Sequence, residues 1–286
     1  MKDFLSRWLA RPVQKPVLQA PLDLMLALHT DTGPVREHNE DCIAALNAPA
    51  AEGDRTTLVA LADGMGGHQA GELASRLAVE AALRSFGQPQ GTPVERLHAA
   101  LAAANEAVYS QAQQGAQWQG MGTTLVLFAP TEHGGFVAWV GDSRLYLWRE
   151  GVLTQITRDD TLVRGLLERG IIAASEAAAH PDASVLTQAV GTHATIPSPH
   201  VHGPVLLQAG DRVLLTSDGV HDVVSEHELA TALQADSPHD AVQRIHAAAL
   251  RNGANDNISI GVALMRTPQA APPAPRSTRS DIEVST

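Results

Sequence analysis

Four short acidic motifs lie far apart along this chain of 286 residues, and each places a carboxylate in a stretch rich in glycine, asparagine or charge. They read REHNED at 36–41, ADGMGG at 62–67, TSDG at 216–219 and NDN at 255–257. If these carboxylates meet in the fold, their repulsion has to be relieved by protons or by metal ions. Carboxylate oxygens are hard ligands, which favour Mg²⁺ or Mn²⁺ over Zn²⁺. The pattern therefore predicts a hydrolase that uses two metal ions.

The bulk composition excludes several classes of protein. The net charge is −11, from 31 acidic and 20 basic residues, which argues against nucleic-acid binding because such proteins carry a basic face. The single cysteine, Cys42, excludes a disulfide within the chain and suits a reducing cytoplasm, where we expect the protein to reside. No apolar run approaches the roughly 20 residues needed to cross a bilayer, so no transmembrane segment is expected.

The chain is predicted to hold one domain, at 23–266, with an appendage at each end. Residues 1–22 place Phe4, Leu5, Trp8 and Leu9 on one helical face before prolines break the helix. This segment is interpreted either as an anchor for a membrane surface or a partner, or, more commonly for such segments, as a short helix or frayed tail. The proline-rich stretch at 267–286 is expected to be disordered.

Hydrophobic periodicity predicts clustered strands and paired helices inside this domain. Strands are expected at 22–29, 57–62, 124–128, 135–140, 144–148, 212–216 and 258–264. Helices are expected at 71–86, 93–114, 160–169 and 238–251. This arrangement is typical of α+β layers, and the imperfect alternation along the strands indicates that most are covered on both faces.

Each acidic motif has both an ordinary and a functional interpretation. Asp63 and Asp218 each follow an apolar strand and precede a glycine, an arrangement typical of simple turns but also able to bring a carboxylate and a backbone carbonyl close to a ligand. Arg36 is able to clamp a phosphate oxygen. Glu40 and Asp41 are adjacent, so on a strand one could bind an ion directly while the other acts through water.

Seven segments, taken together and in order, carry a family resemblance. The chain resembles the type-2C (PPM) metal-dependent protein serine/threonine phosphatases in their bacterial form, over almost the whole of 24–264. The matching segments lie at 30–41, 62–72, 122–124, 140–144, 186–191, 214–219 and 255–257. The resemblance implies a four-layer αββα sandwich, in which two antiparallel sheets are flanked by helix pairs and the metal ions lie at one end.

The resemblance also implies a role for each acidic residue. It implies two Mn²⁺ or Mg²⁺ ions, and a possible third, held by the ligands Asp41, Asp63 (bridging), Gly64 (through its carbonyl), Asp218 and Asp256. Glu40 would act through a water, and Arg36 would bind the substrate phosphate. Asp142 matches a position linked in bacterial members to the third ion, and Asp222 would support that ion or Asp218.

The chain departs from the family pattern at two places. Animal members carry a histidine soon after the Asp-Gly pair, which is taken to protonate the leaving group, whereas this chain has Met65, with His38 and His68 nearby. At 159–160 it has Asp-Asp where relatives often have Asp-His, next to a segment, 156–192, that is expected to form a mobile flap beside the site.

The expected function is hydrolysis of phosphoserine and phosphothreonine in proteins, reversing a bacterial Ser/Thr kinase, by a chain that acts as a monomer. Two alternatives stay open: a catalytically silent binding module with the same fold, and a phosphatase for a small phosphoester. A cysteine-based phosphatase needs an arginine six positions after its cysteine. That position after Cys42 is occupied by Ala48, so this class is excluded. Zinc-binding Cys-x-x-Cys and His-Glu-x-x-His spacings do not occur either.

Overall fold

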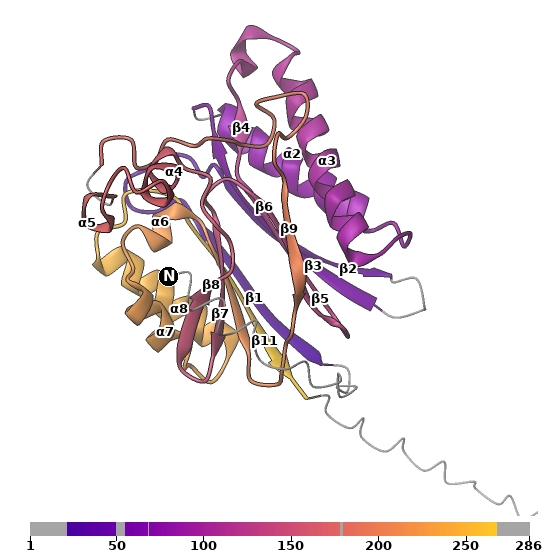
Figure 1. Ribbon diagram of the computed structural model, residues 1–286, viewed down its shortest axis with the longest axis vertical. Coiled ribbons are helices and arrows are strands. Elements are labelled where there is room, and N and C mark those ends of the chain that lie inside the picture. The colour runs from indigo at the N-terminus through magenta and orange to yellow at the C-terminus, as the bar shows by residue number, and fades with distance from the viewer. Residues whose placement is uncertain (1–21, 50–54, 68, 178–179, 268–286) are drawn as a thin grey trace, which may run out of the picture.

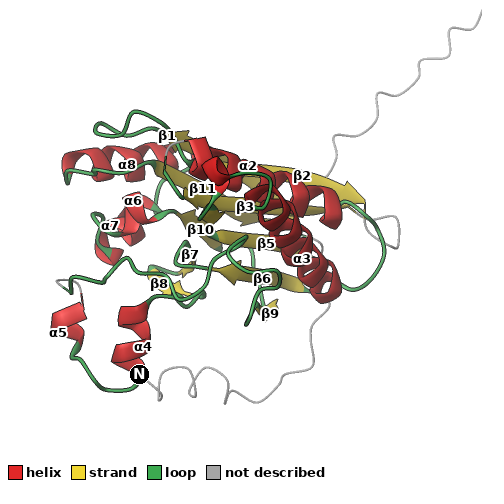
Figure 2. Ribbon diagram, turned by 90° about the horizontal axis from the view of Figure 1, so that it is seen from above, coloured by secondary structure: helices red, strands yellow, loops and turns green. Residues whose placement is uncertain are grey.

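The computed structural model describes residues 22–49, 55–67, 69–177 and 180–267, which form two stacked antiparallel sheets with helices on both outer faces (Figures 1 and 2). The first, here the β1 sheet, has the strand order β1-β11-β10-β7-β8, and the second, here the β2 sheet, has the order β2-β3-β5-β6-β9, with β4 paired to β3. The β1 sheet comprises β1 (Asp23–Asp31), β7 (Arg144–Arg149), β8 (Val152–Gln155), β10 (Arg212–Thr216) and β11 (Ile258–Arg266). The β2 sheet comprises β2 (Asp41–Pro49), β3 (Arg55–Met65), β4 (Gly122–Thr123), β5 (Leu125–Thr131), β6 (Gly134–Val140) and β9 (His200–Val205).

Helices complete the outer layers. The β2 sheet is covered by α2 (Gln69–Phe86) and α3 (Pro93–Ala112), and the β1 sheet by α6 (Asp218–His221), α7 (Glu226–Ala232) and α8 (Pro238–Arg251), as Figure 1 shows. Between β8 and β9 lie the short helices α4 (Leu162–Glu168) and α5 (Ala174–Ala177), and a single 3₁₀ turn, η1 (Ala116–Trp118), follows α3. The predicted αββα sandwich is confirmed.

Three apolar clusters hold the four layers together. Along β3, Val59 and Leu61 pack between the two sheets, whereas Leu58 and Ala60 pack under α2 and α3. A third cluster fills the space between the β1 sheet and α6–α8. Side chains alternate across a strand, so a strand buried on both faces is apolar at every position. This is why the predicted alternation was imperfect.

The sequence prediction located the long elements and missed the short or weakly apolar ones. The helix predicted at 238–251 is α8, which begins after the N-cap Ser237 with Pro238 in its first turn. A capping box formed by Thr92 and Glu95 begins α3, which ends two residues earlier than predicted. The strands β2, β4, β8 and β9 and the helices α5, α6 and α7 were not predicted.

Several sequence predictions fall largely outside the described part of the chain. Apart from Leu22 and Thr267, the expected appendage at 1–22 and tail at 267–286 lie outside it, so both stay predictions. His68 also lies outside the described residues. Within the described ranges, no helix combines the length and the apolar character needed to cross a membrane.

Candidate metal centre

Two of the predicted acids face each other on neighbouring strands. Asp41 begins β2 and pairs in register with Asp63, near the end of β3, so both side chains leave the same face of the β2 sheet. The backbone of Asp63 is fixed on both sides: its N–H donates to the hydroxyl of Thr124 (2.9 Å), and its carbonyl accepts from the hydroxyl of Thr123 (2.8 Å). The sheet thus holds this carboxylate pair in place.

The other two acids come from the β1 sheet. Asp218 stands two residues after the end of β10 and begins α6, and Asp256 stands two residues before β11, the neighbour of β10. Gly219 allows the two segments to touch, because a Cβ there would lie 2.0 Å from the carbonyl oxygen of Asn257. This contact brings Asp218 and Asp256 together at one end of the β1 sheet.

Their proximity appears in their pKa values. Burial raises the pKa of Asp41 to about 7, with Asp218 and Asp256 adding to the rise and hydrogen bonds from Ser217 and Ser259 opposing it. Burial raises the pKa of Asp218 to about 6, and the charge of Asp256 again contributes. These acids resist ionisation together, so the ionised cluster needs cations.

Asp63 is the most perturbed of the group. Burial raises its pKa well above the ordinary value, and the charges of Asp41, Asp218 and Asp142 raise it further. Its hydrogen-bond interaction with Asp218 raises the pKa of Asp63 further. Two carboxylates this close therefore call for a shared proton or a cation between them.

Asp142 and Asp222 extend this group. Burial raises the pKa of Asp142 to about 7, the charges of Asp218, Asp159 and Asp222 add to it, and Arg144 opposes. A cavity of about 370 Å³ is lined in part by Asp63, Asp142 and Asp218, and a neighbouring one of about 570 Å³ by Asp142, Asp218 and Asp222. We call Asp41, Asp63, Asp142, Asp218, Asp222 and Asp256 the acid cluster. Its donors are all carboxylate oxygens, which fits Mg²⁺ or Mn²⁺.

Glu40 and Gly64 lie where three segments meet. The N–H of Gly64 donates to the carbonyl of Glu40 (3.1 Å), and a Cβ on Gly64 would lie 2.1 Å from the carbonyl oxygen of Gly71 in the first turn of α2. The buried carboxylate of Glu40 is so close to Gly71 that a Cβ there would come within 1.8 Å of it. Only glycine at 64 and 71 permits this approach of backbone, helix and acid.

Arg36 lies at the exposed rim of the acid cluster. Its guanidinium donates to Asp256 at 2.5 Å, and 47% of its side chain is exposed. The structure thus places the predicted phosphate-binding residue against one of the predicted ligands, with its stem open to solvent.

Sequence reasoning missed the polar side chains that hold the acids. Ser217 donates to Asp41 (2.7 Å) and accepts from the N–H of Ser259 (3.1 Å), which ties the first β2 residue to the β1 sheet. Thr124 shares a hydrogen bond with Ser143 (2.7 Å). Ser217, Thr124 and Ser143 stand in three of the segments that carry the family resemblance, 214–219, 122–124 and 140–144, and that position was the signal available.

Asn257, the last residue of the NDN motif, also supports this site. Its side-chain oxygen accepts from the N–H of Glu40 (2.8 Å), and its amide donates to the carbonyls of Thr32 (2.8 Å) and His38 (2.9 Å). One amide thus fixes the loop 32–40, which carries Arg36, to the start of β11.

The two departures from the family pattern, Met65 and the Asp159-Asp160 pair, lie in different parts of the site. Met65 lines the 370 Å³ cavity together with His193, whereas His38 is exposed. Asp159 pairs with Arg144 (2.7 Å) beside Asp142. Asp160 is a buried anchor for the 156–192 segment.

Asp160 accepts hydrogen bonds from three sides. They come from the N–H of Gly141 (3.0 Å), the amide of Gln188 (2.7 Å) and the ring of His200 (2.9 Å), which stacks on Trp139 with ring centroids 4.6 Å apart. A histidine therefore does reach this position, but from β9 rather than from residue 160.

Comparison with known proteins agrees with this geometry. A family model described as Protein phosphatase 2C matches residues 36–253. The chain is 42% identical over 245 residues to the serine/threonine protein phosphatase PstP of Mycobacterium tuberculosis (strain CDC 1551 / Oshkosh), covering 85% of this chain but only 45% of PstP. It is 33% identical over 250 residues to the protein phosphatase PhpP of Streptococcus pneumoniae serotype 2 (strain D39 / NCTC 7466), covering 86% of this chain and 99% of PhpP.

A solved structure extends the likeness to three dimensions. The catalytic domain of PstP in complex with two manganese ions superposes with a TM-score of 0.74 at 37% identity, covering 86% of this chain and 100% of that domain. The chain spans about half the length of the mycobacterial relative that it matches. With the family model covering most of its length and its sheets arranged as in that domain, the chain belongs to the protein phosphatase 2C family.

Proposed function

We propose that this chain is a metal-dependent phosphatase that hydrolyses phosphoserine and phosphothreonine in proteins. The observation that carries the proposal is the convergence of Asp41, Asp63, Asp218 and Asp256 from two sheets, with raised pKa values for the first three. Membership of the protein phosphatase 2C family and the two manganese ions in the PstP catalytic domain support it.

Different residues of the acid cluster are proposed as ligands of the two ions. Asp41, Asp63 and the carbonyl of Gly64 would hold the ion pair together with Asp218 and Asp256. The chemistry that such a pair supplies is activation of a water for in-line attack on phosphorus.

Two further parts of the site are assigned supporting roles. Glu40, buried against α2, acts through a water. Asp142, whose pKa is raised by the charges of Asp218 and Asp222, would hold a third ion, and Asp222 would support it. The reason to expect a third ion is the excess of negative charge around Asp218, which a further cation would relieve.

Arg36 orients the substrate. Its ion pair with Asp256 satisfies that carboxylate without a metal ion, and its exposed stem allows it to turn to an incoming phosphate when Asp256 binds an ion. A guanidinium binds two phosphate oxygens at once, which positions phosphorus for a single displacement without a covalent intermediate.

The alternatives predict different outcomes. A silent binding module has no reason to retain a buried acid cluster, because the cluster destabilises the fold when its acids are ionised. A small phosphoester as substrate requires no protein surface beside the cavity. We also propose that the phosphoproteins belong to a bacterial Ser/Thr kinase system in the cytoplasm and that the chain acts as a monomer.

The decisive experiment is release of phosphate from a phosphothreonine peptide in the presence of Mn²⁺. Wild type is compared with Asp218→Asn, and with Asp23→Asn, the same substitution at an exposed acid in β1. We expect activity in wild type and Asp23→Asn, and its loss in Asp218→Asn or after chelation. Activity that survives chelation would contradict the metal mechanism, absence of activity with Mn²⁺ would favour the silent module, and preference for p-nitrophenyl phosphate over the peptide would favour a small substrate.

A further inference from the structure

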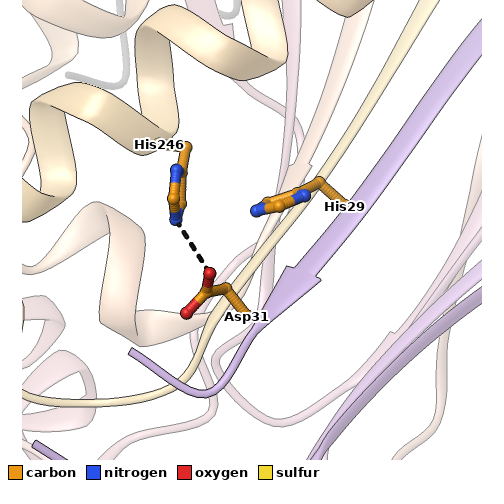
Figure 3. A group of neighbouring side chains, drawn as sticks. All are labelled: His29, Asp31 and His246. Carbon is orange, nitrogen blue, oxygen red and sulfur yellow. Dashed lines mark ion pairs between the residues drawn. The ribbon is translucent and has the colours of Figure 1, made fainter. Parts of the chain in front are cut away.

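A second group of metal-ligating side chains lies outside the acid cluster, between β1 and α8. His29 and Asp31 are two residues apart on β1 and so leave the same face of the strand, towards α8, which packs on it and supplies His246 (Figure 3). We call these three residues the imidazole cluster. Their ligand atoms all lie within 4.8 Å of one another.

The two rings in this cluster leave buried nitrogens unsatisfied. Nε2 of His29 and Nε2 of His246 are both buried without a hydrogen bond, and that of His246 has only an ion-pair contact with Asp31. An unsatisfied buried polar atom destabilises a fold, so such atoms call for an explanation. In Figure 3 the His246 ring points towards Asp31 and the His29 ring towards His246, and a ligand between the rings would satisfy both nitrogens.

Asp31 is oriented by its own backbone. One of its carboxylate oxygens accepts from the N–H of Gly33 (2.6 Å), which leaves the other, Oδ2, 3.3 Å from Nε2 of His246. The side chain of Asp31 is 39% exposed, so the cluster has a path to solvent. The carboxylate is therefore held towards the rings and is reachable from outside.

We propose that His29, Asp31 and His246 form a binding site for a divalent transition-metal ion, with Zn²⁺ as the best match. Two imidazoles and one carboxylate, with a fourth position left to water, form a common zinc ligand set. At Zn–ligand distances of about 2.0–2.1 Å, two tetrahedral ligand atoms lie about 3.3–3.4 Å apart. The His246–Asp31 separation of 3.3 Å already has that value.

Closing the site requires only small movements. The remaining ligand separations are at most 4.8 Å, so they need to shorten by no more than about 1.5 Å, which rotation of the His29 ring supplies. The two rings stand at 70° to each other with centroids 4.6 Å apart, so their nitrogens approach a common point without stacking. Burial and then the neighbouring His246 lower the pKa of His29, which favours the neutral imidazole that metals bind.

The site is connected to the loop that carries Arg36. Thr30, between the two β1 ligands, shares a hydrogen bond with Ser259 (2.8 Å) and accepts from the amide of Asn39 (2.8 Å). Gly33, held by Asp31, begins the same loop. An ion at the imidazole cluster therefore fixes the end of β1 and slows opening of the 32–39 backbone.

The test measures Zn²⁺ binding by equilibrium dialysis with elemental analysis, in excess Mg²⁺ to occupy the acid cluster. The comparison is wild type, His29→Gln, His246→Gln and, as a control on the same helix, the exposed His239→Gln. We expect wild type and His239→Gln to bind one Zn²⁺ more than the other two variants, whose affinity falls by at least about 100-fold, because even residues behind a metal's ligands cost 10–100-fold. Amide hydrogen exchange of 32–39 should slow with Zn²⁺ in wild type alone.

A second measurement covers the case in which a histidine variant does not fold. Co²⁺ bound to wild type in excess Mg²⁺ should give the intense visible absorption of a tetrahedral ion with nitrogen ligands, and Asp31→Asn should weaken it. Equal Zn²⁺ binding by wild type, His29→Gln and His246→Gln, or no Zn²⁺ bound by wild type in excess Mg²⁺, would overturn the proposal and leave an ordinary His–Asp ion pair. Neither outcome bears on phosphatase activity, which is tested separately.

Discussion

The acid cluster and the imidazole cluster use opposite means to gather potential metal ligands. The acid cluster crowds carboxylates that repel one another, so it exists either partly protonated or with cations. The imidazole cluster crowds rings whose neutral form carries no charge, so its cost is only unmet hydrogen bonds at His29 and His246.

This difference decides which ion each cluster suits and what happens without one. Hard oxygens favour Mg²⁺ or Mn²⁺, whereas imidazole nitrogens favour Zn²⁺ and its neighbours. An empty acid cluster stores repulsion that rises with pH, and an empty imidazole cluster stores almost none. Both are joined to the 32–40 loop, the first through Asn257 and the second through Asp31.

The largest expected effect comes from removing the carboxylate at the centre of the acid cluster. Asp63→Asn should lower Mn²⁺-dependent phosphate release on the order of 10³-fold or more, because the proposed bridge between the ions is lost. In chelator, the same variant should be as stable as wild type or more stable, because repulsion among the acids falls. Calorimetry with Mn²⁺ and urea unfolding in chelator measure the two effects.

One result for Asp63→Asn would contradict the role proposed for Asp63. Unchanged Mn²⁺ binding by Asp63→Asn would show that Asp63 is not a ligand. Asp23→Asn, at the opposite end of β1 from the loop, controls for the chemistry of the substitution.

A smaller effect is expected at the rim of the same cluster. Arg36→Ala should raise KM for a phosphothreonine peptide about 10-fold, the equivalent of one charge-assisted hydrogen bond, while Mn²⁺ affinity stays the same or improves as Asp256 is freed. Steady-state kinetics with saturating Mn²⁺ measure KM, and Arg36→Lys should restore part of it. An unchanged KM would remove Arg36 from the phosphate site.

The hydroxyl behind Asp41 tests whether the acid cluster depends on its polar surroundings. Ser217→Ala removes a 2.7 Å hydrogen bond that lowers the pKa of Asp41, so protons should compete better with the metal ion. Mn²⁺ affinity near pH 6.5 should fall about 10-fold and recover as pH rises. Calorimetric titration at two pH values measures this, with the exposed Ser110→Ala as control. If the loss of Mn²⁺ affinity were the same at both pH values, proton competition at Asp41 would not be its cause.

Much of the fold and the acid cluster followed from the sequence, for identifiable physical reasons. Long strands buried on both faces, such as β11, leave continuous apolar runs, and an acid after such a run lies at a sheet end. β2 gave no such signal, because its alanines have low β propensity and it begins with a carboxylate. β9 contains a Gly-Pro pair that marks turns more often than strands.

The imidazole cluster could not be predicted from the sequence. His29 and His246 are separated by most of the chain, and no motif spacing joins them. Their meeting depends on which face of β1 receives α8, which is set by the pairing of β1 with β11 and the packing of α8 over both. The roles of Ser217 and Asn257 depend in the same way on the contact between the two sheets.

The smallest expected effect is on the pH dependence of stability. The two clusters should change the free energy of unfolding in opposite directions as pH rises. In chelator, Asp41 and Asp142 have pKa values of about 7 and Asp218 of about 6, against about 4 in the unfolded chain. The folded state then holds more protons than the unfolded state between about pH 4 and 7. The acid cluster therefore lowers the free energy of unfolding as pH rises through that window.

His29 acts in the opposite direction, because burial lowers its pKa. Below its ordinary value near 6.5 the unfolded state takes up the extra proton, so this residue raises stability as pH increases. Thermal unfolding should therefore be followed in chelator from pH 5 to 7.5. As pH rises, Tm should fall less steeply for Asp218→Asn and more steeply for His29→Gln than for wild type. Each difference should amount to roughly a few degrees. Parallel curves for the three proteins would mean that neither cluster carries the perturbed titration on which the contrast between them depends.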